Sequence, residues 1–503
     1  MTGDGGDKGE DSPPAPSARH IVRQALWFGL GQAANDLAFY VMVLVLAALL
    51  SPHAFGSVAL GMAIVRVANL ITQAGIGGSV ITAKGLTSEE LRRSYWITVG
   101  TALAFAVVIA AVATPLSHTL AAGSDPDVLR FLAFAVVLAA AAVVPSALLR
   151  RELQLKSLAA INAGAAIVTA VIAIIAAVAG AGVWALVARQ LVYQGVIALV
   201  AYRVTRPLVA RLPSAAGRRG PSARSRDGLA FVLISASGLI AMTLDNVVVG
   251  AATDAAQLGF YSLAFTFGFA PLTQISWRLG QVLFPAAAAT QDLELVGRRT
   301  LSILRITSLL LFPLVPVAVV LAPAVIPAVL GEKWAPMVTP FQILLVVGIA
   351  HAVTNTIGES LSGGGGASFR SRIDISWAVG TLALVGVFAL LDGIRGAALG
   401  HLAGFLPLLV GYAWWGTRRI GTDPKRLWEA LRGILGAVAA QAAVTFGLWE
   451  ALSSAPEGAA AAAAAGGGLL TALVVLWRLP SRPFDEARRL IAVARPGRGG
   501  AAA

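Results

Sequence analysis

The sequence predicts an all-α integral membrane protein with about fourteen transmembrane helices, arranged as two pseudo-symmetric six-helix lobes and two C-terminal helices. Three observations support this fold class. The composition is too apolar for a water-exposed surface, since 57% of the 503 residues are hydrophobic, 13% are charged and the mean hydropathy is +0.79. Long apolar stretches recur along the chain, and one short segment recurs in its two halves.

Fourteen apolar stretches are each near or above the roughly 20 residues that cross a hydrocarbon core about 30 Å thick. They lie at 24–50, 55–83, 94–121, 128–149, 158–179, 181–203, 228–252, 258–290, 301–329, 337–362, 373–392, 396–416, 433–453 and 459–479. Several connections are very short, such as 51–54 and 393–395. These two connections follow odd-numbered spans and so lie on the same side of the membrane. Little chain is therefore available on that side to build the active site of an enzyme.

The distribution of Lys and Arg predicts the orientation of the chain. Most of the 38 basic residues fall in connections on one side, among them Arg150, Arg151, Lys156, seven arginines within 203–226, Arg370 and Arg372. Cytoplasmic loops carry an excess of Lys and Arg, so both termini are expected in the cytoplasm. The basic residues of the cytoplasmic loops therefore explain the formal charge of +13, and nucleic acid is not an expected partner.

The same pattern divides the chain into segments. We expect a disordered cytoplasmic tail (1–20), an N-lobe (21–205), a basic cytoplasmic linker (206–227), a C-lobe (228–416), a basic cytoplasmic loop (417–432), two further helices (433–480) and a basic cytoplasmic tail (481–503). Tryptophans such as Trp96, Trp377 and Trp477 lie near expected span ends, as is typical of rings at the membrane interface.

A repeated segment indicates that the two lobes are related. Phe55-Gly56 with Leu60 and Leu258-Gly259 with Leu263 are 203 residues apart. Parallel repeats of this kind typically enclose a central site near the midplane and work by alternating access. Chance similarity between short apolar segments is the alternative explanation.

Charged residues inside the expected spans are the strongest candidates for function. A charge at the centre of a span costs about 2.5–3.5 kcal/mol, so each one needs a partner, a polar cavity or a role. The chain places Asp36, Arg66, Arg189, Asp245, Arg278 and Glu359 in this situation. They could neutralise one another as ion pairs between helices, or they could line a cationic cavity.

In the cavity interpretation, Arg66, Arg189 and Arg278 are candidate ligands for a pyrophosphate headgroup, because a guanidinium donates two parallel hydrogen bonds and keeps its charge. The amides of Asn69, Gln73, Gln190, Gln274 and Gln281 are candidates to contact sugar hydroxyls. Asp36, Asp245 and Glu359 are candidates for coupling to H⁺ or Na⁺. His401 is either a helix-packing residue or a proton-carrying group, and Gly396, Gly400 and Gly404 form a face of small residues that favours close helix packing.

The chain has no Cys, which excludes disulfides, thiolate zinc sites, iron–sulfur clusters and a cysteine nucleophile. The segment Gly363–Gly366 lacks the Lys-Ser/Thr ending of a phosphate-binding loop and is interpreted as a hinge. No cofactor and no metal are expected.

Several short motifs resemble the bacterial polysaccharide (O-antigen and exopolysaccharide) flippase family. In the first half they are the segment from Leu50 to Leu60, Gln73–Gly77, Leu86–Glu90, Pro145–Arg151 and Gly182–Val187; in the second half they are Leu244-Asp245-Asn246, Leu258–Leu263, Val282–Pro285 and Gly331–Trp334. Each motif is weak alone, but together they cover roughly residues 20–420 in the order that this family shows.

The resemblance implies the fold of the multidrug, oligosaccharidyl-lipid and polysaccharide exporter superfamily: two six-helix lobes around a central cavity. It implies that the chain moves an undecaprenyl-pyrophosphate-linked oligosaccharide from the cytoplasmic to the outer leaflet of the bacterial plasma membrane, driven by an ion gradient. The implied partners are this lipid-linked sugar, a coupling cation, membrane lipids and polysaccharide polymerase or assembly proteins. The resemblance also implies that arginines of the cavity contact the pyrophosphate, but their positions vary between members of the family. The choice of Arg66, Arg189 and Arg278 therefore rests on the cost of burying a charge and not on a motif match.

Three other functions are weighed against this one. A non-transporting scaffold for cell-envelope assembly would tolerate neutral replacement of all the buried arginines. A cation-coupled multidrug exporter of the same superfamily would favour carboxylates and aromatics in its cavity, whereas this chain has equal numbers of arginines and carboxylates within its spans. A membrane glycan polymerase or ligase would need a sizeable outer loop with clustered Arg, His or carboxylates, and the expected outer loops are short.

Overall fold

The computed structural model describes residues 18–73, 80–81, 83, 86–120, 124–214, 237–238, 240–290 and 292–478, and this part of the chain is helical and contains no strand. Nine helical segments within it are long and apolar enough to cross a membrane. The expected number of fourteen spans stays a prediction, because part of the expected span 228–252 lies outside the described residues. The expected tails lie largely outside them too, at 1–17 and 479–503.

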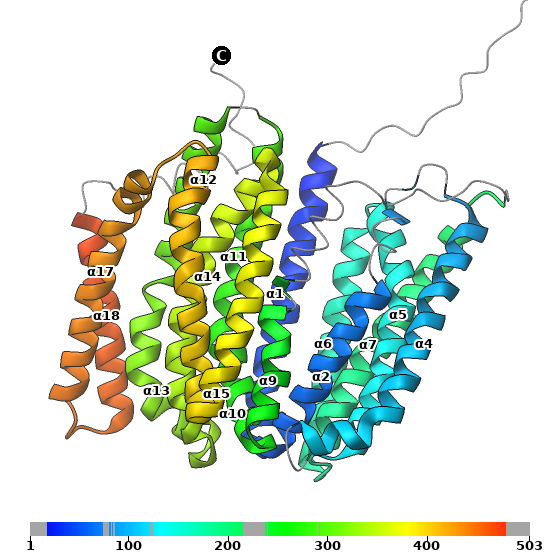
Figure 1. Cartoon of the computed structure of the whole chain (residues 1–503), viewed down its shortest axis with the longest axis horizontal. Coiled ribbons are helices and arrows are strands. Elements are labelled where there is room, and N and C mark those ends of the chain that lie inside the picture. Colours follow the sequence, from blue (N-terminus) through cyan, green and yellow to red (C-terminus); the bar gives the residue numbers. More distant parts are fainter. Residues whose placement is uncertain are drawn as a thin grey trace, which may run out of the picture.

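The helices form two lobes and a C-terminal pair (Figure 1). The N-lobe contains α1 (Ala18–Leu49), α2 (Pro52–Gln73), α4 (Ser88–Thr119), α5 (Pro126–Arg151), α6 (Leu155–Val178) and α7 (Val183–Val209). The C-lobe contains η1 (Ile240–Leu244), α9 (Asp245–Ala252), α10 (Ala255–Ala264), η2 (Phe265–Phe269), α11 (Ala270–Ala288), α12 (Leu293–Leu311), α13 (Leu314–Leu330), η3 (Glu332–Met337), α14 (Val338–Leu361), η4 (Ser362–Gly366), α15 (Ala367–Gly411), η5 (Tyr412–Gly416) and α16 (Thr417–Arg419). The pair is α17 (Pro424–Ala451) and α18 (Glu457–Arg478), which pack against each other beside the C-lobe.

Local sequence signals explain where several helices begin. Thr87 and Glu90 form a reciprocal capping box at the start of α4, which satisfies two backbone N–H groups that the helix leaves open. Asp423 caps α17 by accepting from the N–H of Arg426, and Pro424 occupies the first turn. The second half of the expected loop 417–432 therefore belongs to a helix.

Helix α15 is bent back on itself at Asp392 and Gly393, whose backbone angles are not helical. Its two arms pack closely through glycines: a Cβ on Gly400 would lie 2.7 Å from the Cα of Val385, and one on Gly404 would lie 2.3 Å from Oγ1 of Thr381. The expected close packing of this small-residue face is confirmed.

The most extensive contact between the lobes among the described helices joins α2 to α10. It lies at the end of the bundle where both helices begin (Figure 1). Trp334 of η3 is fully buried at the same end, where its Nε1 donates to the carbonyl oxygen of Ala47 at 2.8 Å and its ring contacts Phe55 and Phe260 edge-on. This end of the bundle is closed by contacts between the lobes.

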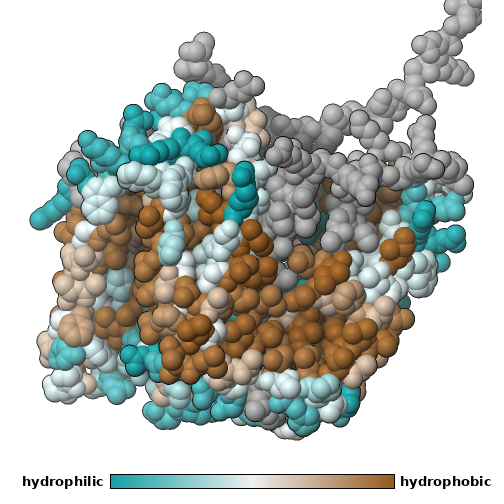
Figure 2. Space-filling model, in the orientation of Figure 1, coloured by the Kyte–Doolittle hydropathy of each residue, from teal (hydrophilic) through white to brown (hydrophobic). Residues whose placement is uncertain are grey.

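The exposed surface carries a broad apolar belt between two hydrophilic rims (Figure 2). Large apolar residues such as Val107, Ile175 and Leu391 are exposed. An apolar belt of this kind suits the hydrocarbon core of a bilayer, so the chain is a multi-pass membrane protein.

Candidate functional site

A cavity of about 490 Å³ lies between the two lobes. The N-lobe contributes Arg66 and Leu70 of α2. The C-lobe contributes residues of η1, α11, α14, α15 and η5, which are Met242, Thr243, Trp277, His351, Thr354, Asn355, Glu359, Arg370, Asp374, Trp377, Leu408 and Tyr412, together with Ser237 and Gly238. Its volume is in the range of about 300–1,000 Å³ that is typical of small-ligand pockets.

Arg66 presents a charge to this cavity from the N-lobe. It is exposed, and no carboxylate of the described residues lies within salt-bridge distance of it. Asp245 and Arg189 act on Arg66 electrostatically from further away. Arg189 of α7 lies with its guanidinium 5.6 Å from the centre of the Phe39 ring, and its Nε is buried without a hydrogen-bond partner among the described residues. The structure therefore brings two of the predicted arginines into electrostatic range of each other.

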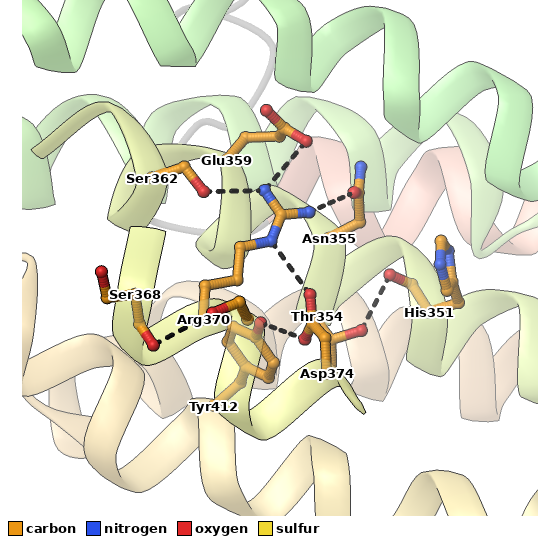
Figure 3. A network of polar contacts seen from close by, with 10 residues as sticks. His351, Thr354, Asn355, Glu359, Ser362, Ser368, Arg370, Asp374 and Tyr412 are labelled. Carbon is orange, nitrogen blue, oxygen red and sulfur yellow. Dashed lines mark hydrogen bonds and ion pairs between the residues drawn. The ribbon is translucent and has the colours of Figure 1, made fainter. Parts of the chain in front are cut away.

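The opposite wall of the cavity carries a network centred on Arg370 (Figure 3). Its Nη1 lies 3.1 Å from Oε1 of Glu359, and its Nε lies 3.2 Å from Oδ2 of Asp374. The hydroxyl of Tyr412 donates to Oδ1 of Asp374 at 2.6 Å. Nη1 and Nη2 also donate to Ser362 and Asn355. With one guanidinium and two carboxylates, this wall carries a formal charge of −1.

The backbone is shaped to admit Arg370. A Cβ added to Gly358 would lie 2.9 Å from Nε of Arg370, and one added to Gly280 would lie 2.8 Å from Cγ of Glu359. Glycines at these positions of α14 and α11 allow the charged side chains to lie directly against neighbouring helices.

Arg278 and Asp36 form an ion pair between α11 of the C-lobe and α1 of the N-lobe. Beside it, Nε2 of Gln274 donates to the hydroxyl of Tyr40 at 3.2 Å. These predicted residues therefore connect the lobes to each other. Neither Arg278 nor Asp36 is among the residues that line the cavity.

Asp245 belongs to a separate buried cluster within the C-lobe. It accepts a hydrogen bond from Tyr261 at 2.9 Å, and Nε2 of His401 lies 3.3 Å from Oδ2 of Asp245. All three side chains are almost completely buried. The segments η1 and η2 next to Asp245 and Tyr261 are wound as π-helices, a conformation that is often found at functional sites.

Of the remaining predicted residues, Asn69 and Gln190 are not among those that line the cavity. Gln190 is buried in α7, and Asn69 lies on α2 one turn beyond Arg66. Gln73 and Gln281 lie in helices, but their side chains are outside the described residues.

Several residues of the C-lobe wall were not predicted from the sequence to face a cavity. Arg370 was assigned to a cytoplasmic connection and Trp377 to the membrane interface; instead Arg370 is buried, and Trp377 packs on Phe405 with ring centres 4.6 Å apart at the cavity. The spacing of Arg370 and Asp374, four residues apart on one helical face, was the signal that could have identified this pair.

The structure gives the predicted charges within the spans different surroundings. Arg278 pairs with Asp36, in the way that the ion-pair interpretation expects, and Glu359 pairs with Arg370, which was not among the predicted charges. Arg66 faces the cavity without such a partner among the described residues, as the cavity interpretation requires. The cavity is therefore cationic on its N-lobe side and acidic on its C-lobe side.

Comparisons with known proteins agree with this architecture. The family described as polysaccharide biosynthesis protein matches residues 45–339. The lipopolysaccharide biosynthesis protein WzxC of Escherichia coli K12 is 25% identical over 356 residues, which are 67% of each chain. The succinoglycan biosynthesis transport protein ExoT of Rhizobium meliloti is 25% identical over 323 residues, which are 64% of this chain and 65% of ExoT.

A solved structure of the lipid II flippase MurJ in an inward closed conformation has the same fold. It superposes with a TM-score of 0.69 at 10% identity and covers 93% of this chain and 100% of MurJ. The match to the family model spans more than half of the chain, and the chain belongs to the polysaccharide biosynthesis protein family of membrane proteins.

Proposed function

We propose that this protein is a flippase that moves an undecaprenyl-pyrophosphate-linked oligosaccharide from the inner to the outer leaflet of the bacterial plasma membrane, by ion-coupled alternating access. The sugar would serve the synthesis of lipopolysaccharide or exopolysaccharide. The observation that carries the proposal is Arg66, a guanidinium exposed to an interlobe cavity without a carboxylate at salt-bridge distance among the described residues. A pyrophosphate is the kind of partner that such a group binds strongly.

The physical need for a carrier supports the proposal. A glycan headgroup cannot cross hydrocarbon unaided, because its hydroxyls and phosphates would lose water without gaining partners. A cavity with Arg66 on one side and carboxylates, amides and indoles on the other supplies such partners within the membrane. WzxC is named for lipopolysaccharide biosynthesis, ExoT for transport in succinoglycan biosynthesis, and MurJ as a flippase of lipid II.

The orientation follows from the charge distribution as part of the same proposal. Both termini, the linker 206–227 and the loop that precedes α17 would be cytoplasmic, and the end closed by α2, α10 and Trp334 would be the outer end. The conformation would then be closed to the outside, and transport would require α2 and α10 to separate.

Among the three candidate coupling residues, Asp245 is the best placed. Asp36 and Glu359 each pair with a permanently charged arginine. Asp245 has Tyr261, His401 and Asn246 as its close partners, and none of these carries a permanent positive charge. A carboxylate in such surroundings can change its occupancy by a proton or a cation at lower cost than one fixed to arginine.

The test uses the purified protein in proteoliposomes that contain a polyprenyl-pyrophosphate-linked oligosaccharide. An impermeant oxidant reports which leaflet displays the sugar. Wild-type protein should make the sugar of the inner leaflet accessible to the oxidant, and Arg66→Ala should not. Arg130→Ala is the control and should behave as wild type, because Arg130 is exposed, pairs with Asp127 and is not among the residues that line the cavity. If wild-type protein leaves the inner pool protected under every imposed ion gradient, the proposal is wrong.

A further inference from the structure

A second cavity, of about 700 Å³, lies within the N-lobe, where α4 begins and where α5 and α7 end. Its lining consists of residues of these three helices and Ser214, so it shares no residue with the interlobe cavity. Helices α4 and α7 both pack on α5. In Figure 1, α4 forms the edge of the N-lobe that is turned away from the C-lobe. The transport path between the lobes therefore does not account for this cavity.

Two arginines give the cavity a positive charge. Arg92 of α4 and Arg206 of α7 line it, and both are exposed. Within the described ranges, neither lies at salt-bridge distance from a carboxylate, although Glu89 lines the same cavity. Two positive charges and one negative charge give a formal charge of +1. Guanidiniums in this situation favour a phosphate, because each can donate two parallel hydrogen bonds to its oxygens.

The rest of the lining is aromatic and apolar. Trp96 and Tyr202 are 63% and 52% exposed, and the rings of Tyr95 and Tyr202 lie with their centres 6.5 Å apart. Tryptophan and tyrosine are enriched at the depth of the lipid headgroups. Val144 and Leu148 of α5 form an apolar floor. A small soluble anion would leave these surfaces uncovered, whereas the acyl chain of a lipid would cover them.

The cavity also lies where the chain leaves the N-lobe. The N–H of Ser88, at the start of α4, donates to the carbonyl oxygen of Pro213 at 3.1 Å. Ser88 and Ser214 both line the cavity. A ligand that contacts Arg92 and Arg206 would therefore hold the start of α4 to the end of α7.

We propose that this cavity binds an anionic phospholipid of the surrounding bilayer. The phosphate lies between Arg92 and Arg206, the glycerol backbone lies against Trp96 and Tyr202, and an acyl chain covers the apolar floor. Basic pockets between helices on the cytoplasmic side are typical sites for anionic headgroups, and the proposed orientation puts the cavity on that side. The inference goes beyond the proposed function, because this lipid stabilises the N-lobe and is not transported.

The test is native mass spectrometry of the full-length protein, delipidated in detergent and titrated with dioleoyl phosphatidylglycerol or dioleoyl phosphatidylcholine. The two lipids have the same acyl chains, and only phosphatidylglycerol is anionic. Wild-type protein should bind its first phosphatidylglycerol about tenfold more tightly than its first phosphatidylcholine, the value of one charge-assisted hydrogen bond. Arg92→Gln/Arg206→Gln should remove this preference. Lys425→Gln/Arg426→Gln, which removes the same charge from exposed positions at the start of α17, should keep it.

Thermal unfolding gives a second measurement. Phosphatidylglycerol should raise the unfolding temperature of the wild-type protein by several degrees over phosphatidylcholine, because a ligand that binds only the folded state stabilises it. Arg92→Gln/Arg206→Gln should unfold at the wild-type temperature in phosphatidylcholine, since both side chains are exposed, and should lose the increase in phosphatidylglycerol. An undiminished increase in this variant would overturn the proposal.

Two competitors distinguish the bilayer lipid from other sources of phosphate. Inorganic phosphate and farnesyl pyrophosphate, a short polyprenyl pyrophosphate, should each fail to displace phosphatidylglycerol at equal concentration. Displacement by inorganic phosphate would show a simple anion site. Displacement by farnesyl pyrophosphate that depends on Arg92 and Arg206 would show that the cavity receives a polyprenyl lipid, and the proposal would be wrong in either case. An equal loss of preference in the two double variants would also contradict it, because binding would then follow overall charge.

Discussion

Gly56 and Gly259 lie against each other's helices at the contact between the lobes. A Cβ on Gly56 would lie 1.7 Å from the carbonyl oxygen of Ala255, and one on Gly259 would lie 1.9 Å from that of Pro52. The two glycines occupy corresponding positions of segments 203 residues apart. The repeated segments therefore pack on each other, and their glycines allow α2 and α10 to approach at backbone distance.

The first prediction concerns this crossing. Gly259→Ala should lower the free energy of unfolding by about 1–3 kcal/mol, because the added methyl group cannot fit against the Pro52 carbonyl. Gly100→Ala is the matched control, since nothing lies within 4 Å of a Cβ at Gly100 of α4. Thermal unfolding in detergent measures both, and equal unfolding temperatures for Gly259→Ala and wild type would contradict the close packing.

The second prediction concerns Arg370. Arg370→Ala should destabilise the protein by about 3–5 kcal/mol, because it leaves Glu359 and Asp374 close together without their shared counter-charge. Arg372→Ala, two residues further along the same helix, should change stability by less than about 0.5 kcal/mol because Arg372 is exposed. Denaturant unfolding of the two variants gives the comparison. A similar effect for both arginines would show that the network contributes no specific stability.

The third prediction concerns the ion pair between the lobes. Asp36→Asn should increase the affinity for farnesyl pyrophosphate severalfold, because it keeps the size of the side chain and releases Arg278 from its counter-charge. The double variant Asp36→Asn/Arg278→Gln should return to the wild-type affinity or below. If Asp36→Asn leaves the affinity unchanged, Arg278 has a purely structural role.

The fourth prediction concerns Asp245. Asp245→Asn should abolish the acceleration of flipping by an imposed H⁺ or Na⁺ gradient and preserve slow flipping without a gradient, because the amide keeps its shape but cannot change its charge. Tyr261→Phe should retain the gradient response and cost about 1–3 kcal/mol of stability, since it removes a buried hydrogen bond to a carboxylate. Proteoliposome assays with each gradient separate the two ions. A full gradient response in Asp245→Asn would exclude this residue as the coupling site.

The fold was predictable because burial cost and hydropathy act on every residue of a membrane helix. The bend at Gly393, the close packing of Gly400 and Gly404 and the relation between Gly56 and Gly259 all follow patterns that are visible in the sequence. The site was less predictable. Arg278 and Arg370 have the same chemistry as Arg66, and only the three-dimensional arrangement shows which arginines meet a carboxylate.

Arg370 escaped prediction for a related reason. It follows a glycine run that interrupts the apolar pattern, and an arginine in that position is usually assigned to a loop. The chain instead remains inside the bundle at Arg370. Asp374 lies one turn further along the same helix, and Tyr412, which bonds to Asp374, lies 38 residues away in the sequence, so its proximity is not visible there.

The same glycine run has a consequence for the electrostatics of the cavity. The backbone leaves helical geometry at Gly364 and Gly365, between Glu359 on α14 and Arg370 with Asp374 on α15. Bending at this point changes the distance from the guanidinium to Glu359 while its distance to Asp374, on the same helix, stays fixed. Bending of the backbone alone can therefore alter the electric field that acts on a substrate in the cavity. No ion has to bind to the C-lobe wall or leave it.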